Sequence, residues 1–560
     1  MNLAKTAMTK ETLDMHEFTS ATMGELLQDT ASRFPDHVAL VYPETGLKQD
    51  YAEFYNACKE AAKGFMAIGV KKGDHVSIWT TNIPEWIHMQ FGLSMIGAVL
   101  VTVNANYKTN ELDYILNQSD STTLVLMEEY RDTSFYETVR EVIPELDNYR
   151  PGQIKSENLP YLKNVIYIGS RNKTPGMYSF DEVIELGKNI FDQDLEERQK
   201  TLHFHDVVNM QYTSGTTGFP KGVMLTHYNI INNARMVGDV MGMTEKDSLL
   251  IQVPLFHCFG CVMSSLNCVV HGSTMVVIEN FDPIKALKYV EQEKCTAING
   301  VPTMFIAILS HADFGKYDLS SLRTGIMAGA PCPVETMNQV IEKMHCPEVV
   351  IAFGQTECSP VMTMTRRDDP VDVRVSTVGM LLPGIQGKII DPETGQDLPA
   401  KVQGEIVTKS SCVMKGYYKM PDETKEAIDK DGWLHTGDLG IIDENGNFEV
   451  TGRIKEMIIR GGENIYPREI EEFLHKNPKV NDAYVVGIPD KKYGEQLLAI
   501  VILNSGEQAS AEEFISFCTG KTARHKIPKY WEFVDEVPMT ASGKVQKYKI
   551  IENYASKYAA

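Results

Sequence analysis

The chain contains the stretch VVNMQYTSGTTGFPKG at residues 207–222. Its apolar start predicts a buried strand over 207–212. The glycines after that strand let the backbone approach an anion closely, and the hydroxyl side chains offer hydrogen-bond donors. Lys221 adds a positive charge at the end of the loop. The order strand, loop and lysine therefore favours a phosphate-binding loop over a flexible Gly/Ser/Thr linker.

This loop differs from the common nucleotide-binding loop of kinases and ATPases. That loop carries a Gly-Lys pair followed by Ser or Thr. Here Pro220 precedes Lys221 and Gly222 follows it. The sequence therefore predicts a phosphate site of another family.

Strand and helix patterns alternate along the first two-thirds of the chain. Apolar residues at helical spacing predict a helix over 51–68, and β-rich residues predict a strand over 75–79. The same patterns predict helices over 84–96 and 109–118 and strands over 98–103, 122–127, 248–253, 274–278, 324–328 and 348–352. Strands separated by helices predict parallel sheets covered by helices, which is an α/β fold.

The pattern of predicted strands and helices changes after about residue 374. Gly- and Pro-marked turns separate short strands over 374–452, which predicts a small antiparallel, barrel-like subdomain. A smaller α+β unit follows, with a helix that begins near Pro467, strands over 482–488 and 497–503, and a helix over about 510–518. We expect an N-terminal extension over 1–20, a large domain over 21–453 and a mobile C-terminal domain over 454–560.

Composition excludes several functional classes. The 560 residues are 43 % apolar and 23 % charged, and the net charge is −21, which disfavours nucleic-acid binding. The N-terminus has no apolar stretch of signal-peptide length, and the longest near-apolar run, over 91–103, is too short for a membrane span, so we expect a cytoplasmic protein without integral membrane segments. Cys258, Cys261, Cys268 and His271 stand at zinc-like intervals, but their apolar surroundings favour buried, reduced thiols.

Five further motifs follow the loop in the same order as in a known family. They are Ala328-Gly-Ala-Pro331, Phe353-Gly-Gln-Thr-Glu357, Trp433-Leu-His-Thr-Gly-Asp438, Gly452-Arg-Ile-Lys455 and Ser542-Gly-Lys544. Together with TSGTTGFPKG they resemble the motifs of adenylate-forming enzymes, which include acyl-CoA synthetases, luciferases and the adenylation domains of peptide synthetases. The resemblance extends from about residue 20 to about residue 550. It implies that ATP and a carboxylic acid form an acyl-AMP, and that the acyl group then passes to a thiol.

The resemblance also implies an ATP site. Its phosphate loop would be Thr213, Ser214, Gly215, Thr216, Thr217, Gly218, Phe219, Pro220 and Lys221. Glu357, with Thr213, would bind Mg²⁺, and Thr356 would donate to the α-phosphate. Gly329, Ala330 and Phe353 would contact adenine, although the family more often has Tyr at position 353.

Further implied residues lie near the C-terminus. Asp438 would accept hydrogen bonds from the ribose hydroxyls, Arg453 would reach the same ribose, and Lys455 would be the hinge of the C-terminal domain. Lys544 would be the catalytic lysine of the adenylation step. Gly461 and Gly462 would lie against the pantetheine arm of coenzyme A, with Ile459 where many relatives have lysine and with Arg460 as its candidate replacement. Seven basic residues over 521–549 could meet the coenzyme A phosphates.

Two uncharged segments bear on the acid. Residues 256–270 and 297–310 line the acyl pocket in relatives and contain no Asp, Glu, Lys or Arg here. Small or adaptable residues such as Gly260 and Gly300 suggest room for an apolar tail. We therefore expect a medium- to long-chain fatty acid, with His257 between the ATP and acyl sites, and most resemblance to the mitochondrial medium-chain branch.

Three alternatives remain open from the sequence. One is an acyl-AMP ligase that loads a carrier protein, and another is a ligase for aryl or other carboxylates. A non-enzymatic scaffold is disfavoured because Lys544 and Glu357 are both present. The expected partners are ATP, Mg²⁺, the fatty acid and coenzyme A, and a homodimer is left open.

Overall fold

A computed structural model describes residues 18–213, 220–460, 463–491, 493–540 and 544–558. These residues form two compact units. The larger unit holds residues 18–386 and 409–434, and the smaller unit holds residues 387–408 and 435–558. The predicted bounds of the N-terminal extension and of the mobile C-terminal domain stay predictions.

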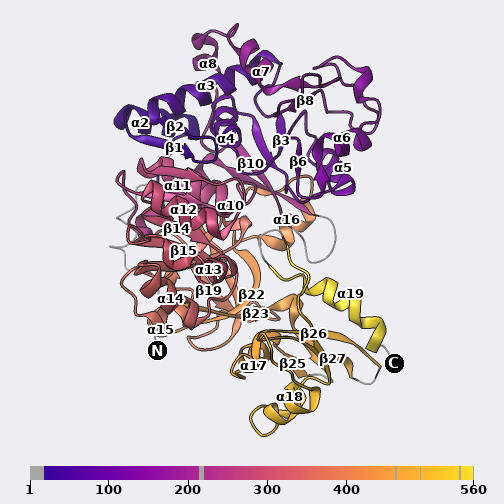
Figure 1. Ribbon diagram of the computed structural model, residues 1–560. Helices are drawn as coiled ribbons and strands as arrows, with labels where there is room; N and C mark the ends of the chain where they lie inside the picture. Colours follow the sequence, from indigo (N-terminus) through magenta and orange to yellow (C-terminus); the bar gives the residue numbers. More distant parts are fainter. Residues whose placement is uncertain (1–17, 214–219, 461–462, 492, 541–543, 559–560) are drawn as a thin grey trace. The chain divides into compact units, whose positions relative to one another are not determined.

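The larger unit is built on two long sheets. The nine-stranded sheet has the order β18 (Met380–Leu381), β17 (Val361–Met364), β16 (Glu348–Gly354), β15 (Thr324–Ala328), β14 (Ala297–Gly300), β12 (Ser248–Ile251), β13 (Thr274–Val277), β1 (Val38–Tyr42) and β2 (Leu47–Asp50). Its strands from β16 to β1 are parallel, and the outer strands are antiparallel. Figure 1 shows β14 and β15 of this sheet beside helices α12 and α13, and β1 and β2 in indigo.

The eight-stranded sheet carries the phosphate loop. Its order is β21 (Gly416–Tyr417), β11 (Lys221–Thr226), β10 (Val207–Thr213), β4 (Val99–Thr102), β3 (His75–Trp79), β5 (Thr123–Leu126), β8 (Asn164–Tyr167) and β9 (Tyr178–Ser179). The strands from β10 to β9 are parallel, and β11 runs antiparallel to both neighbours. A separate hairpin joins β6 (Glu129–Tyr130) and β7 (Thr133–Ser134).

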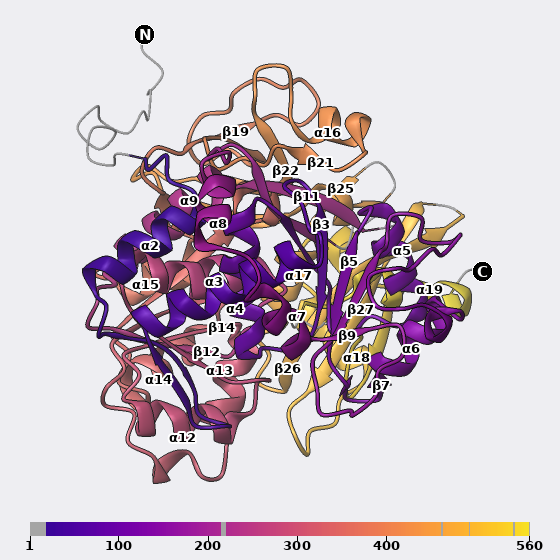
Figure 2. The same ribbon diagram turned by 90° about the horizontal axis from the view of Figure 1, so that it is seen from above.

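Helices flank both sheets, and their ends have local causes. Helix α3 (Tyr51–Ala67) starts after Asp50, whose side chain caps the first turn, while α4 (Pro84–Ile96) starts at a proline and ends at Gly97. The two helices run side by side in both views (Figure 2). The remaining helices of this unit are α2 (Met23–Arg33), α5 (Thr109–Gln118), α6 (Phe135–Val142), α7 (Phe180–Gly187), α8 (Asp192–Gln199), α9 (His227–Met241), α10 (Cys258–Gly260), α11 (Asn267–His271), α12 (Pro283–Glu293), α13 (Pro302–Leu309), α14 (Val334–Lys343), α15 (Val371–Ser376) and α16 (Pro421–Ala427).

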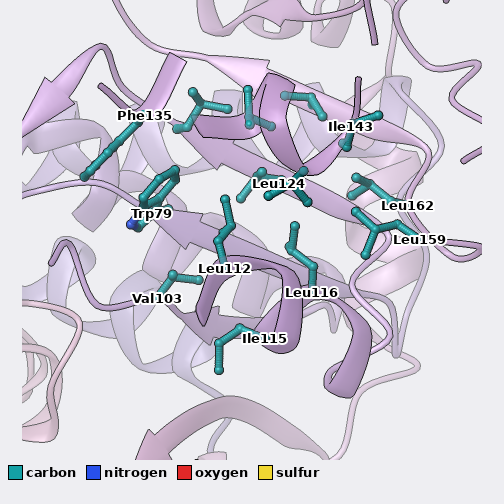
Figure 3. Packing of buried hydrophobic residues seen from close by; sticks show 14 of the residues in the cluster. Trp79, Val103, Leu112, Ile115, Leu116, Leu124, Phe135, Ile143, Leu159 and Leu162 are labelled. Carbon is teal, nitrogen blue, oxygen red and sulfur yellow. The ribbon is translucent and has the colours of Figure 1, made fainter. Parts of the chain in front are cut away.

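Hydrophobic clusters pack each of the two long sheets against helices. In the first, the Trp79 and Phe135 rings stack with centroids 3.8 Å apart, and Leu112, Leu116 and Leu124 pack in the same cluster (Figure 3). The second cluster fills the space between the nine-stranded sheet and helices α12 to α14. Burial of such side chains is worth roughly 1.5–3 kcal/mol each, so these clusters fix the strand ends that carry the candidate site.

The smaller unit contains two sheets. One has the order β19 (Gln386–Ile390), β20 (Gly404–Lys409), β22 (Leu434–Ile442) and β23 (Phe448–Arg453), and its last two strands are antiparallel. The barrel-like character expected of this segment stays a prediction. The other pairs β25 (Glu463–Ile465), β24 (Ile458–Arg460), β27 (Gly494–Leu503), β26 (Val480–Asp490) and β28 (Tyr530–Phe533). Its helices are α17 (Pro467–Leu474), α18 (Ala511–Cys518) and α19 (Lys547–Tyr558).

Both faces of the five-stranded sheet are covered. Side chains alternate along β27, so Leu497, Ala499 and Val501 join one hydrophobic cluster while Leu498 and Ile500 join another. Helices α17 and α18 contribute to the first cluster and α19 to the second. The predicted α/β architecture with a small α+β C-terminal part is confirmed.

Candidate active site

The phosphate loop connects two antiparallel strands of the eight-stranded sheet. Thr213 ends β10 and lies directly opposite Lys221, the first residue of β11. The carbonyl of Pro220 accepts a hydrogen bond of 2.9 Å from the Tyr114 hydroxyl, which anchors the loop end to α5. The predicted loop residues Ser214, Gly215, Thr216, Thr217, Gly218 and Phe219 lie outside the described residues.

The predicted metal residue lies close to this loop. Glu357 and the neighbouring Thr356 occupy a 3₁₀ turn, η4 (Thr356–Cys358), which follows the end of β16. Glu357 is 9 % exposed, and its Oε1 accepts a hydrogen bond of 2.8 Å from the Tyr417 hydroxyl. The Lys221 ammonium lies 4.8 Å from the centroid of the same tyrosine ring. The fold thus brings together three residues that are far apart in the sequence.

The segment that carries Tyr417 is fixed by backbone hydrogen bonds. Tyr417 on β21 lies opposite Val223 on β11, and the Met414 amide donates to the Glu357 carbonyl at 2.8 Å. Burial, together with the negative charge of Glu357, raises the pKa of the Tyr417 phenol far above its ordinary value. Sequence reasoning missed this tyrosine, and its only local sign is a glycine and two aromatic residues between Lys415 and Lys419.

The residues present fit a magnesium ion that also binds substrate phosphates. Within the described residues, Glu357 Oε2 accepts no hydrogen bond, and no cluster of three or more His, Cys, Asp or Glu side chains could hold a metal by itself. Mg²⁺ usually takes one or two protein carboxylates and completes its shell with water and phosphate oxygens. A single buried carboxylate beside a phosphate loop matches that pattern.

The predicted adenine contacts lie at the ends of adjacent parallel strands. Gly329 and Ala330 follow β15, and Phe353 lies near the end of β16, where Ala328 pairs with Ala352. Gly329 has φ +90°, a conformation that favours glycine, and a Cβ there would approach Val301 to 3.2 Å. Ligands of α/β proteins commonly bind at the carboxyl ends of parallel strands, so this edge suits a nucleotide base.

His257, which is predicted to lie between the ATP and acyl sites, precedes a short helix as its N-cap. Its Nδ1 accepts a hydrogen bond of 3.2 Å from the Phe259 amide, which caps α10. The next residue, Cys258, donates to Gln211 Oε1, and Gln211 in turn donates to Cys261, both at 2.9 Å. Burial raises the pKa of the Cys261 thiol to about 12, so these thiols are protonated. The zinc-like spacing therefore reflects a buried helix, as the apolar surroundings predict.

The room expected at Gly260 is not found. A Cβ at Gly260 would lie 2.2 Å from the Pro254 carbonyl oxygen, so this glycine serves close packing of the backbone and the prediction that it widens an acyl pocket is wrong. A Cβ at Gly300 would lie 3.1 Å from the side chains of Gln252 and Phe305, and the expectation for this glycine stays a prediction. A cavity of about 780 Å³ lies elsewhere in this unit, between Tyr42, Ile83, Glu85 and Tyr167.

The smaller unit holds the predicted ribose residues as a pair. Asp438 on β22 lies directly opposite Arg453 on β23, and Arg453 Nε donates to Asp438 Oδ1 at 2.7 Å. Asp438 is therefore a strand residue and not a turn aspartate, although Gly437 precedes it. Burial raises the pKa of Asp438, and the positive charges of Arg453 and Lys544 oppose that rise.

Lys544 and Lys455 are both exposed residues of the same unit. The Lys544 amide donates to Thr540 Oγ1 at 3.0 Å, and Lys455 lies in the turn η5 (Ile454–Glu456). Lys547, which begins α19, bridges Glu456 at 3.0 Å and Glu471 at 2.8 Å. Lys547, three residues after Lys544, therefore links the segment of the predicted catalytic lysine to the turn that contains Lys455.

The predicted coenzyme A contacts are described in part. Gly461 and Gly462 lie outside the described residues. Ile459 is 50 % exposed, whereas Arg460 stacks on Tyr493 and donates to Gln496, because successive strand residues point to opposite faces. Arg460 therefore does not replace a lysine at position 459.

The basic stretch over 521–549 is partly neutralised. Lys526 pairs with Glu469 at 2.7 Å and Lys529 with Asp490 at 3.5 Å, in addition to the Lys547 ion pairs. This pairing reduces the charge available to phosphates. Within the described part of the chain, no helix is long and apolar enough to span a membrane.

Comparison with known proteins identifies the family of the chain. The model of the AMP-binding enzyme family matches residues 27–418, and the model of the AMP-binding enzyme C-terminal domain matches residues 469–544. YngI of Bacillus subtilis (strain 168), which is named as an acyl-CoA synthetase, is 54 % identical over 96 % of this chain and 98 % of its own length. The mitochondrial medium-chain acyl-CoA ligase ACSF2 of Danio rerio is 39 % identical over 96 % of this chain and 89 % of its own length.

A solved structure gives the same result for the fold. ATP-bound MatB from Rhodopseudomonas palustris superposes with a TM-score of 0.82 at 28 % identity, over 96 % of this chain and 100 % of that one. The family models together cover well over half of the chain, and the two sequence relatives align with it almost from end to end. The chain belongs to the AMP-binding enzyme family.

Proposed function

We propose that this chain is an AMP-forming ligase that joins a medium- to long-chain fatty acid to coenzyme A. The observation that carries the proposal is that Lys221, at the end of the phosphate loop, and Glu357, in the turn after β16, both contact Tyr417. A fixed cation and a buried carboxylate at one loop suit a magnesium–triphosphate group. The names of the relatives YngI and ACSF2 support the same activity.

In the first half-reaction, a carboxylate oxygen of the acid attacks the α-phosphorus of ATP. The bond to the β-phosphate oxygen breaks, and pyrophosphate leaves with that electron pair. Lys221 offsets charge on the leaving phosphates, and Thr356 donates a hydrogen bond to the α-phosphate. Mg²⁺ held by Glu357 would neutralise phosphate charge and orient the triphosphate.

The smaller unit supplies residues for the nucleoside and for the crowded α-phosphate. Asp438 accepts from the ribose hydroxyls, while the positive charge of Arg453 opposes the rise that burial causes in the pKa of that carboxyl. Lys544 brings a positive charge to the developing negative charge of the transition state. In the second half-reaction the coenzyme A thiolate attacks the acyl carbon, and AMP leaves.

The acid is proposed from the two uncharged segments. Residues 258–266 are buried, and apart from Ile306 the apolar residues of α13 are at least partly buried, so no fixed charge is available for a polar acid tail there. An amino-acid activator would need a carboxylate near His257 to hold the ammonium group. An apolar acyl chain is therefore the better substrate.

The test is a screen of pyrophosphate release over straight-chain acids from acetate to stearate, plus benzoate, with and without coenzyme A. We expect the highest kcat/KM for medium or long chains and steady AMP formation only when coenzyme A is present. A preference for benzoate would replace the fatty acid by an aryl acid. Acyl-AMP that accumulates regardless of coenzyme A would indicate an acyl-AMP ligase that loads a carrier protein.

A further inference from the structure

Tyr417 lies between the two charged residues of the phosphate site. Its hydroxyl donates to Glu357 Oε1 at 2.8 Å, and its ring centroid lies 4.8 Å from the Lys221 ammonium. The side chain is 9 % exposed. We propose that Tyr417 is a positioning residue that holds the metal carboxylate and the phosphate lysine apart and in place, an inference that rests on the proposed function.

A neutral partner suits both neighbours better than a direct ion pair would. If Lys221 and Glu357 paired with each other, each would lose the charge that phosphate and Mg²⁺ require. The aromatic face restrains the flexible lysine chain without neutralising it. The hydroxyl restrains one carboxylate oxygen and leaves Oε2 for the metal.

The backbone of the tyrosine is fixed. The Tyr417 amide donates to Thr424 Oγ1 at 2.9 Å, and β21 pairs with β11. A fixed backbone, a buried ring and one polar contact suit a residue that keeps Lys221 and Glu357 at fixed positions.

Two substitutions separate the two contacts. Tyr417→Phe keeps the ring beside Lys221 and removes the bond to Glu357, whereas Tyr417→Leu removes both. The matched control is Tyr418→Phe, which deletes a similar bond, from the Tyr418 hydroxyl to Asp120 at 2.9 Å, one residue further along the chain. All three proteins are compared with wild type by melting temperature.

The main readout is binding of Mn²⁺ to the ATP complex, followed by electron paramagnetic resonance without acid or coenzyme A. The KM for ATP in pyrophosphate release is the second. Loss of a hydrogen bond to a metal ligand usually weakens metal binding by about 10- to 100-fold, so we expect Tyr417→Phe to weaken Mn²⁺ binding about tenfold with little change in the ATP KM. Tyr417→Leu should also raise the ATP KM, by about three- to tenfold, because the cation–π contact is lost.

The outcomes are distinct. Mn²⁺ binding by Tyr417→Phe equal to that of wild type, or no weaker than that of Tyr418→Phe, would overturn the positioning role. A fall in melting temperature with normal metal and ATP binding would assign the tyrosine to stability alone. Wild-type protein that binds Mn²⁺ and ATP but activates no acid would overturn the fatty-acid proposal and leave this one standing. Wild-type protein without nucleotide binding would overturn both.

Discussion

Asp438→Asn should lower nucleotide affinity without lowering stability. A hydrogen bond to a charged acceptor is worth about 1.5–3 kcal/mol and one to a neutral acceptor about 0.5–1.5 kcal/mol. The amide therefore loses about 1–2 kcal/mol of ribose binding, which is a roughly 5- to 30-fold rise in the Kd for ATP. Isothermal titration calorimetry with ATP measures this change directly.

The stability of the same variant follows from burial. The Asp438 side chain is 4 % exposed and its pKa is raised, so ionising this group in the folded protein costs free energy that asparagine avoids. The ion pair offsets little, because the Arg453 side chain is 45 % exposed and such pairs contribute about 0–1 kcal/mol. We expect a melting temperature at neutral pH within about 2 °C of wild type, or higher.

The sign of the pH dependence gives a further check. Because the folded-state pKa of Asp438 is raised, its contribution to stability is complete below the unfolded pKa and is lost as pH rises through the folded pKa. The stability of the asparagine variant relative to wild type should therefore grow as pH rises from the acidic range, and then level off near neutrality.

Asp247→Asn is the matched control. This carboxylate, 5 % exposed, also pairs with an arginine, Arg323 at 2.8 Å. Burial alone would raise the pKa of Asp247, but hydrogen bonds from Arg323 and Thr296 bring it below its ordinary value. The ionised Asp247 carboxylate therefore stabilises the fold above the unfolded-state pKa. Asp247→Asn should lower the free energy of unfolding by about 1–3 kcal/mol at neutral pH without changing ATP affinity. Unchanged ATP affinity in Asp438→Asn, or equal destabilisation of both variants, would refute the reasoning.

Three other variants test the remaining assignments. Lys544→Ala should slow acyl-AMP formation by orders of magnitude while supplied acyl-AMP still reacts with coenzyme A, because the charge acts in the first step; equal loss in both steps, measured separately, would make the lysine structural. Glu357→Gln should raise the Mg²⁺ concentration needed for half-maximal pyrophosphate release, and an unchanged magnesium titration would place the ligand elsewhere. Lys455→Pro should still form acyl-AMP but transfer it slowly to coenzyme A, since proline fixes φ at a hinge. Lys455→Ala is its control, and equal loss of transfer in both variants would point to side-chain chemistry.

The sequence predicted the elements whose patterns are long or sharply bounded. The strands over 75–79 and 324–328 and the helix over 84–96 have the expected bounds, since Gly and Pro mark their ends. Strand β14 was missed because its four buried residues adjoin the equally apolar α13 and show no alternation. Helix α19 was missed because its lysine-rich sequence has only a weak apolar face.

The site was predictable to the extent that motifs mark it. Lys221 and Glu357 stand in recognisable motifs, but Tyr417, which contacts both, does not. Glu357 precedes this tyrosine by 60 residues in the sequence, and Lys221 precedes it by many more. Such contacts arise from β21 pairing with β11, and strand pairing of distant segments has no local signature. The wrong expectation at Gly260 has a similar cause, because close packing against Pro254 and an open pocket both select glycine.

The two hydrophobic clusters on the five-stranded sheet bear on how the chain unfolds. Each is made of residues from 458–558 alone, so this segment carries a complete interior and its helices cover both sides of its own sheet. Cooperativity extends only as far as shared interior packing, and a chain with separate interiors need not melt in one step. A single melting midpoint for this enzyme would then average over separate events, and a substitution near the C-terminus could abolish turnover while most of the heat of unfolding stays unchanged.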